Sequence, residues 1–284
     1  MKRAVIQGLL SVAVLCFAVG TKALGSAQAA QNPPAAGQAA PPPQGKRPPQ
    51  TKTQPEFDAW KAASGLTDAA AAEKAADDFA TKFPDSEVRV LLYKNAMRLD
   101  QNANNAERTE AMGRKVLGLD GDDPEALVAV AGVIAERTKD TDIDKDQRYA
   151  EGISLAHKAT QTVDTDVSVP PGTPQDKINA YKAYLRSTAF SFIGTIEYSK
   201  ANYPAAQENL QKSIDADPSN PDPVAVLRLA LTFDKEEKYP EALKWANRAV
   251  EMTQDNTAIG TPARRERDRL QQLTGGTPPT PPKN

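Results

Sequence analysis

Two neighbouring segments of this 284-residue chain repeat one pattern of small and large apolar side chains. Gly194 and Ala206 in the first segment recur as Ala230 and Ala242 in the second, at the same offset of 36 residues. Small side chains let two antiparallel helices cross at close range. A pair of such helices cannot bury its apolar stripe alone and must stack on neighbours. The repeat therefore predicts an array of helix pairs.

Prolines mark where the second helix of each segment begins. Pro204 follows Tyr203, and Pro240 follows Tyr239. Proline is tolerated in the first turn of a helix and breaks the chain's hydrogen bonding further along. Each segment is therefore expected to form a helix, a tight turn and a second helix.

These two segments resemble the tetratricopeptide repeat, or TPR. The match begins with an aromatic residue, an aliphatic residue and glycine at Phe190, Ile193 and Gly194, and the best repeats span residues 187–220 and 223–256. Other matching positions are Ala206, Leu210, Pro218, Val226, Leu229, Phe233, Ala246 and Ala249. The segments depart from the family pattern at Glu197, Ser213 and Gln254. The resemblance implies a right-handed α-solenoid with a concave binding groove.

The periodicity elsewhere between residues 56 and 273 is also helical, and no alternating run is long enough for a strand. Helices are expected at residues 55–64, 67–83, 86–101, 105–119, 124–137 and 147–161, followed by a long helix opened by Pro174 and a last helix at 263–273. The predicted fold is thus all-α, a right-handed solenoid of about five TPR-like helix pairs with a C-terminal capping helix.

The two ends of the chain have a different composition. Residues 1–30 resemble a secretory signal, with a basic start at Lys2 and Arg3, an apolar run and a small-residue cleavage site. Residues 31–55 are rich in Pro, Ala and Gln, and residues 274–284 are rich in Pro, so both are expected to be disordered.

The signal predicts export, with a periplasmic or extracellular destination. An uncleaved membrane anchor is the alternative, disfavoured by Gln7, Gly8 and Ser11 inside the apolar run. Cleavage would leave no stable membrane anchor. It would also remove Cys16, the only cysteine, so the mature chain would hold no thiol or disulfide.

Groups for catalysis are scarce. His157 is the only histidine, and there is no phosphate-binding glycine loop or dinucleotide fingerprint. The chain carries 35 basic and 37 acidic residues, a balance that does not favour nucleic acid. The arginines of the last helix alternate with acids, which indicates a solvated cap. No enzymatic activity, cofactor or metal is predicted.

One acidic stretch offers an alternative function. Asp140, Asp142, Asp144 and Glu151 occupy positions 1, 3, 5 and 12 of an EF-hand calcium loop. Lys145, however, replaces the glycine that makes the turn in that loop. A calcium-responsive helical module using loop 140–151 is the second hypothesis, and a solvated acidic loop is its simpler reading.

The TPR resemblance implies which residues face a partner. The first helix of each pair lines the groove, which gives Ser191, Thr195, Tyr198, Leu227, Leu231 and Asp234 in the best repeats and, by weaker alignment, Lys94, Arg98, Gln101 and Val128. For Leu227 and Leu231, burial under the capping helix is an equal alternative. The sequence therefore predicts a non-enzymatic scaffold that binds a protein or peptide.

Overall fold

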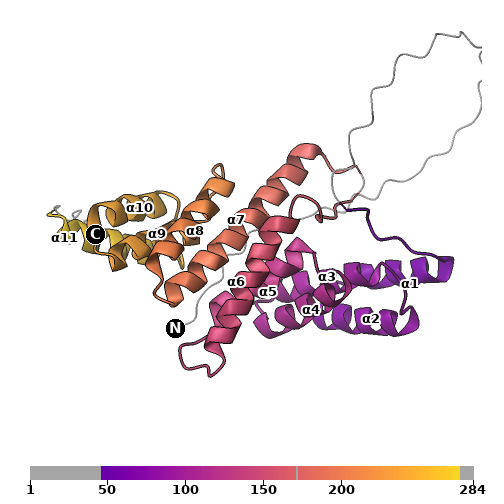
Figure 1. The fold of residues 1–284 in the computed structure, drawn as a ribbon. Helices are drawn as coiled ribbons and strands as arrows, with labels where there is room; N and C mark the ends of the chain where they lie inside the picture. Colours follow the sequence, from indigo (N-terminus) through magenta and orange to yellow (C-terminus); the bar gives the residue numbers. More distant parts are fainter. Residues whose placement is uncertain (1–45, 171, 276–284) are drawn as a thin grey trace, which may run out of the picture.

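The computed structural model describes residues 46–170 and 172–275 (Figure 1). Within them the chain forms eleven helices and no strand. The helices are α1 (Gln54–Ser64), α2 (Ala69–Lys82), α3 (Arg89–Asn102), α4 (Ala106–Leu119), α5 (Pro124–Arg137), α6 (Lys145–Thr162), α7 (Gln175–Ser199), α8 (Tyr203–Ala216), α9 (Pro223–Lys235), α10 (Tyr239–Glu251) and α11 (Gly260–Leu273). The expected signal, residues 31–45 of the expected linker and residues 276–284 of the expected tail lie outside the described residues.

Successive helices pack as pairs, α1 with α2 through α9 with α10, and α11 covers α10. Each second helix also packs on the first helix of the next pair, as α2 does on α3 and α8 on α9. Figure 1 shows the array running from α1 and α2 at one end to α11 at the other, with α6 and α7 in the middle. The predicted all-helical solenoid of five pairs and a cap is confirmed.

Local chemistry fixes most helix starts. The side chains of Asp68, Asp123 and Asp222 accept a hydrogen bond from the first turn of α2, α5 and α9. Proline stands in the first turn of α8 and α10, as the sequence predicts. The boundaries agree with the predicted ones to within a few residues.

Three pairs share one tight turn between their helices. Asn104, Ala201 and Glu237 have positive φ angles of 56°, 57° and 59°, and the backbone N–H that follows each of them donates to the last turn of the first helix. The third pair lacks this turn and has residues 138–144 between α5 and α6. The regular repeat is therefore interrupted at this pair.

The small residues of the repeat lie where the helices cross. A Cβ placed on Gly194 would lie 2.6 Å from Leu210 Cγ on α8, closer than carbon atoms can approach. Ala206, Ala230 and Ala242 are each fully buried. These four positions hold the last two pairs together, as predicted.

A fifth small residue, Gly132 on α5, makes a similar contact with another pair. A Cβ placed there would lie 2.6 Å from Phe192 Cζ on α7. The Phe192 ring thus reaches the α5 backbone, and this contact joins the first helices of two successive pairs.

The chain before α1 is described from Lys46 onwards. Thr53 caps α1, and its side chain and that of Glu56 form a reciprocal capping box. Helix α1 thus begins at Gln54, inside the stretch expected to be linker. Among the described residues, no helix combines the length and apolar character needed to span a bilayer.

Replacing Gly194 by Ala should destabilise the array, because the new methyl group would overlap Leu210. We expect a loss of about 1–3 kcal/mol in the free energy of unfolding, measured by urea denaturation followed by circular dichroism. Gly118→Ala is the matched control, because Gly118 on α4 has no atom within 4 Å of an added Cβ. That change should stabilise the helix by up to about 1 kcal/mol. Equal effects of the two changes would contradict the close crossing.

Candidate partner-binding face

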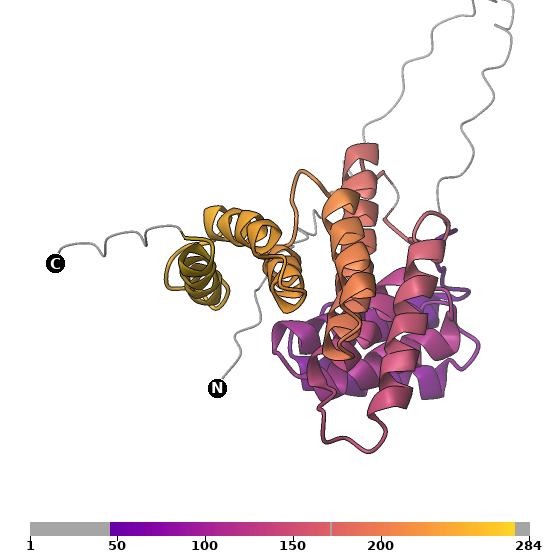
Figure 2. The same ribbon diagram turned by 60° about the vertical axis from the view of Figure 1, so that its left-hand side comes forward.

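The first helices of the pairs lie next to one another along one side of the array. Helix α1 contacts α3, α5 contacts α7, and α7 contacts α9. Figure 2 shows α7 between the α1–α5 part of the array and the α9–α11 part. We call the side formed by α3, α5, α7 and α9 the first-helix face. All ten residues predicted to line the groove lie on these four helices.

A buried ion network occupies the α3 and α5 part of this face. Lys94 Nζ lies 2.7 Å from Asp123 Oδ2 and 3.1 Å from Glu125 Oε2. Arg98 Nη2 donates to Glu125 at 2.7 Å. Burial alone would raise the pKa of Glu125, but Lys94 and Arg98 outweigh it and lower that pKa to about 2. Lys94 is thus a buried structural cation, while the Arg98 side chain stays 52% exposed.

Two tyrosines from the first half of α7 border this network. Burial raises the pKa of Tyr181, and so does the negative charge of Glu125. Tyr184, one turn further along, is 47% exposed. Burial raises its pKa, and so do the charges of Asp222 and Glu125, at the starts of α9 and α5. Neither tyrosine was predicted to line the face.

Four of the predicted groove residues are covered by the chain itself. Val128, Ser191, Thr195 and Leu227 are 6%, 3%, 4% and 6% exposed. The Thr195 hydroxyl donates to the Ser191 carbonyl at 2.7 Å and accepts from Arg228 on α9 at 2.5 Å. Val128 packs in a cluster with residues of α7 such as Leu185 and Ile193. Adjacent first helices pack closely enough to enclose these side chains, which leaves a partner little of their surface.

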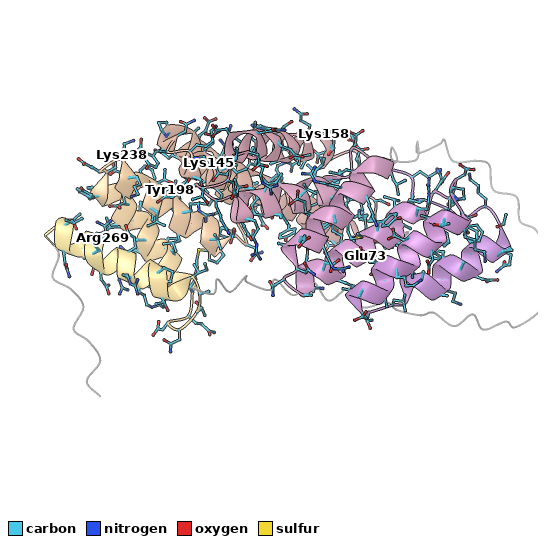
Figure 3. All side chains as sticks on the ribbon, turned by 90° about the horizontal axis from the view of Figure 1, so that it is seen from below. Glu73, Lys145, Lys158, Tyr198, Lys238 and Arg269 are labelled. Atoms are coloured by element: carbon cyan, nitrogen blue, oxygen red, sulfur yellow. The ribbon has the colours of Figure 1, made fainter. Side chains whose placement is uncertain are left out.

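Three of the remaining predicted positions, Tyr198, Leu231 and Asp234, lie toward the C-terminal end of the face, where Figure 3 labels Tyr198 and Arg269. Tyr198 is partly buried, and its ring centroid lies 5.8 Å from that of Tyr203. Leu231 is partly buried and packs against the apolar core formed by α8, α9, α10 and α11. Asp234 forms an ion pair with Arg269, which also pairs with Glu266 at 2.8 Å. Gln101, at the other end, is exposed.

The accessible part of the face therefore includes Arg98, Tyr184, Tyr198 and Leu231. Several of its charged side chains are paired, Lys94 and Arg98 with Asp123 and Glu125, and Asp234 with Arg269 of α11. These pairs leave an aromatic and apolar surface with little net charge between them.

The acidic stretch of the calcium hypothesis is partly helical. Residues from Lys145 onward belong to α6, and Glu151 pairs with Arg114 at 2.6 Å. Asp140 is exposed and lies 3.6 Å from Lys145 Nζ. Within residues 46–170 and 172–275, no group of three or more His, Cys, Asp or Glu side chains is arranged to hold a metal. The hypothesis stays a prediction, and a calorimetric calcium titration with Asp140→Ala as control tests it.

Comparison with known proteins bears on the fold. No protein-family profile and no curated protein sequence matches the chain. Among solved structures, Pseudomonas aeruginosa PilF matches with a TM-score of 0.53 at 17% identity, over 78% of this chain and 87% of its own. PilW, a type IV pilus biogenesis factor, matches with a TM-score of 0.50 at 16% identity, over 79% and 88%. The TPR protein YrrB gives 0.44 at 17% identity, over 70% and 85%. The matches to PilF and PilW, together with the stacked helix pairs, show that the chain has the TPR-like repeat fold.

The low pKa of Glu125 predicts a stability change in acid. Its folded pKa of about 2 lies below its ordinary value of 4.5, so the stabilisation is complete above about pH 4.5 and is lost as the pH falls toward 2. The loss should be on the order of 3 kcal/mol. Glu125→Gln should be less stable at pH 7 and should flatten this acid limb in urea denaturation.

Glu208→Gln is the control for that measurement. Glu208 on α8 forms an exposed pair with Lys212, and its loss should leave the acid limb unchanged. If Glu125→Gln keeps the acid limb of the unmodified chain, the buried network does not stabilise the fold as described.

Proposed function

We propose that this protein is a non-enzymatic scaffold that holds an extended segment of a protein partner on its first-helix face. The TPR-like fold supports this, because stacked helix pairs create a long continuous surface and no enclosed active-site cleft. The partial exposure of Tyr184 and Tyr198 on that surface supports it further, because rigid aromatic side chains are preferred anchors at protein interfaces.

The observation that carries this proposal is the position of Tyr184. It is one of the few large apolar side chains exposed in the described chain, and it belongs to α7, the first helix that packs against both α5 and α9. A partner segment crossing α5, α7 and α9 would bury its ring. Because the neighbouring charges are paired internally, we infer that affinity depends on aromatic and apolar burial and responds weakly to salt.

We further propose that the scaffold acts outside the cytoplasm. The signal-like composition of residues 1–30 supports export to the periplasm or the cell exterior. The fold similarity to PilF and PilW is compatible with a place in the cell envelope, since PilW is named for pilus biogenesis.

A displayed library of linear peptides tests the face directly. We expect the full chain to select peptides with aromatic or apolar residues, and Tyr184→Ala and Tyr198→Ala each to weaken the selected peptide about 5- to 10-fold, as loss of an anchor does. Leu231→Ala should weaken it less, because Leu231 is only partly exposed. Fluorescence anisotropy measures each affinity.

Leu119→Ala serves as the control in that assay, because Leu119 is 40% exposed at the end of α4, a second helix. It should bind the selected peptide as the unmodified chain does. A selected peptide whose affinity none of the three face variants changes would refute the proposed site.

A further inference from the structure

A second aromatic surface lies at the start of the array. Phe57 and Trp60 on α1 and Val88 before α3 line a hollow of about 290 Å³, together with Pro49 and Gln50. The two aromatic ring centroids lie 5.8 Å apart. Phe57, on the first helix of the fold, is 38% exposed. The hollow is thus an aromatic site separate from the first-helix face.

Residues 46–53, which we call the arm, lie beside α1 and the start of α3, and Pro49, Gln50 and Thr51 form part of the wall of this hollow. Arg47 Nη2 donates to both carboxylate oxygens of Glu87, at 2.9 and 2.8 Å, and the Gln50 backbone N–H donates to Glu87 Oε2 at 3.2 Å. Lys52 Nζ donates to the Asp85 carbonyl at 2.8 Å. Pro49 lines the hollow together with Phe57 and Trp60. A charge-assisted pair and a backbone hydrogen bond are contacts by which a groove recognises a peptide, and here they stand next to a proline and two aromatic rings.

The arm is held weakly and fills the site incompletely. The Arg47 and Glu87 side chains are 62% and 37% exposed, and exposed ion pairs contribute little to stability. Trp60 also lines the hollow, and its indole Nε1–H is buried without an acceptor among the described residues. A buried donor without a partner is costly.

We propose that the surface covered by the arm, around this hollow, is a docking site for an extended, basic, proline-containing segment of a partner protein, and that the arm competes with that partner for it. The chemistry of the occupant follows from the arm, whose Arg47-Pro48-Pro49 sequence supplies a cation next to two prolines. Proline favours the extended conformation before binding, which lowers the entropic cost of docking.

Acidic groups along the arm's path fit the same kind of occupant. Glu87 pairs with Arg47, and Asp120 lies 2.5 Å from Lys46 Nζ. Asp166 follows at 3.7 Å from the same nitrogen. Lys46 and Arg47, the first two cations of the arm, thus both lie next to carboxylates. These carboxylates would repel an acidic segment.

A labelled peptide with the sequence of residues 46–53, KRPPQTKT, tests the site in trans on the full chain. Arg47→Glu in the chain should release the arm and raise the peptide's affinity about 10-fold, because a covalently linked competitor acts at a high effective concentration. Glu87→Lys should weaken binding, because the new cation repels the arginine of the peptide. A peptide with Glu at its second position should bind only the Glu87→Lys chain. Fluorescence anisotropy reports each affinity.

Lys74→Glu is the matched control, because it makes the same charge change at the exposed Lys74–Asp78 pair on α2. It should keep the affinity of the unmodified chain. Peptide that does not bind the Arg47→Glu chain, or binds the Glu87→Lys chain unchanged, overturns the proposal and leaves the arm a structural strap.

Sedimentation of the unmodified chain distinguishes a second occupant. A concentration-dependent dimer that disappears in Glu87→Lys would identify the arm of a second copy as the ligand and overturn the assignment to a partner protein. Neither result depends on Tyr184 or Tyr198, so this site and the first-helix face can fail separately.

Discussion

The structure depends on helices that approach closely enough to exclude all but the smallest side chains. Gly194 faces Leu210 with no room for a methyl group, and the alanines that follow the same pattern are fully buried. Because each helix pair leaves an apolar stripe uncovered, close crossings within a pair are matched by close stacking between pairs. A change in one crossing would shift every later pair relative to the earlier ones.

The same closeness decides which chemistry the first-helix face can offer. Where α3 meets α5, the cations Lys94 and Arg98 are neutralised by carboxylates from the next pair. Where α7 meets α9, Thr195 is enclosed and bonded to Arg228. The face therefore keeps few free charges, and its exposed aromatic rings become the principal features that a partner can recognise.

The sequence predicted the parts of the fold that are set locally. Prolines and the repeated small residues located the helix pairs, because both act within a turn or a crossing. The exposed residues of the first-helix face were predicted less well. The family pattern begins at residue 187, whereas α7 begins at Gln175, so the pattern assigns no role to the first half of that helix. Tyr184 precedes that pattern. The pairing of Lys94 with Asp123 joins residues 29 positions apart, and local periodicity carries no sign of it.

Composition also indicated only disorder for residues 31–55, while the contacts of residues 46–53 depend on Glu87 and Trp60 being brought together by the fold.

Hydrogen exchange on the full chain, with and without a peptide selected by it, tests the central claim most directly. The account predicts added protection in α7 and α9 and none in α8 and α10. Protection confined to the second helices would contradict it.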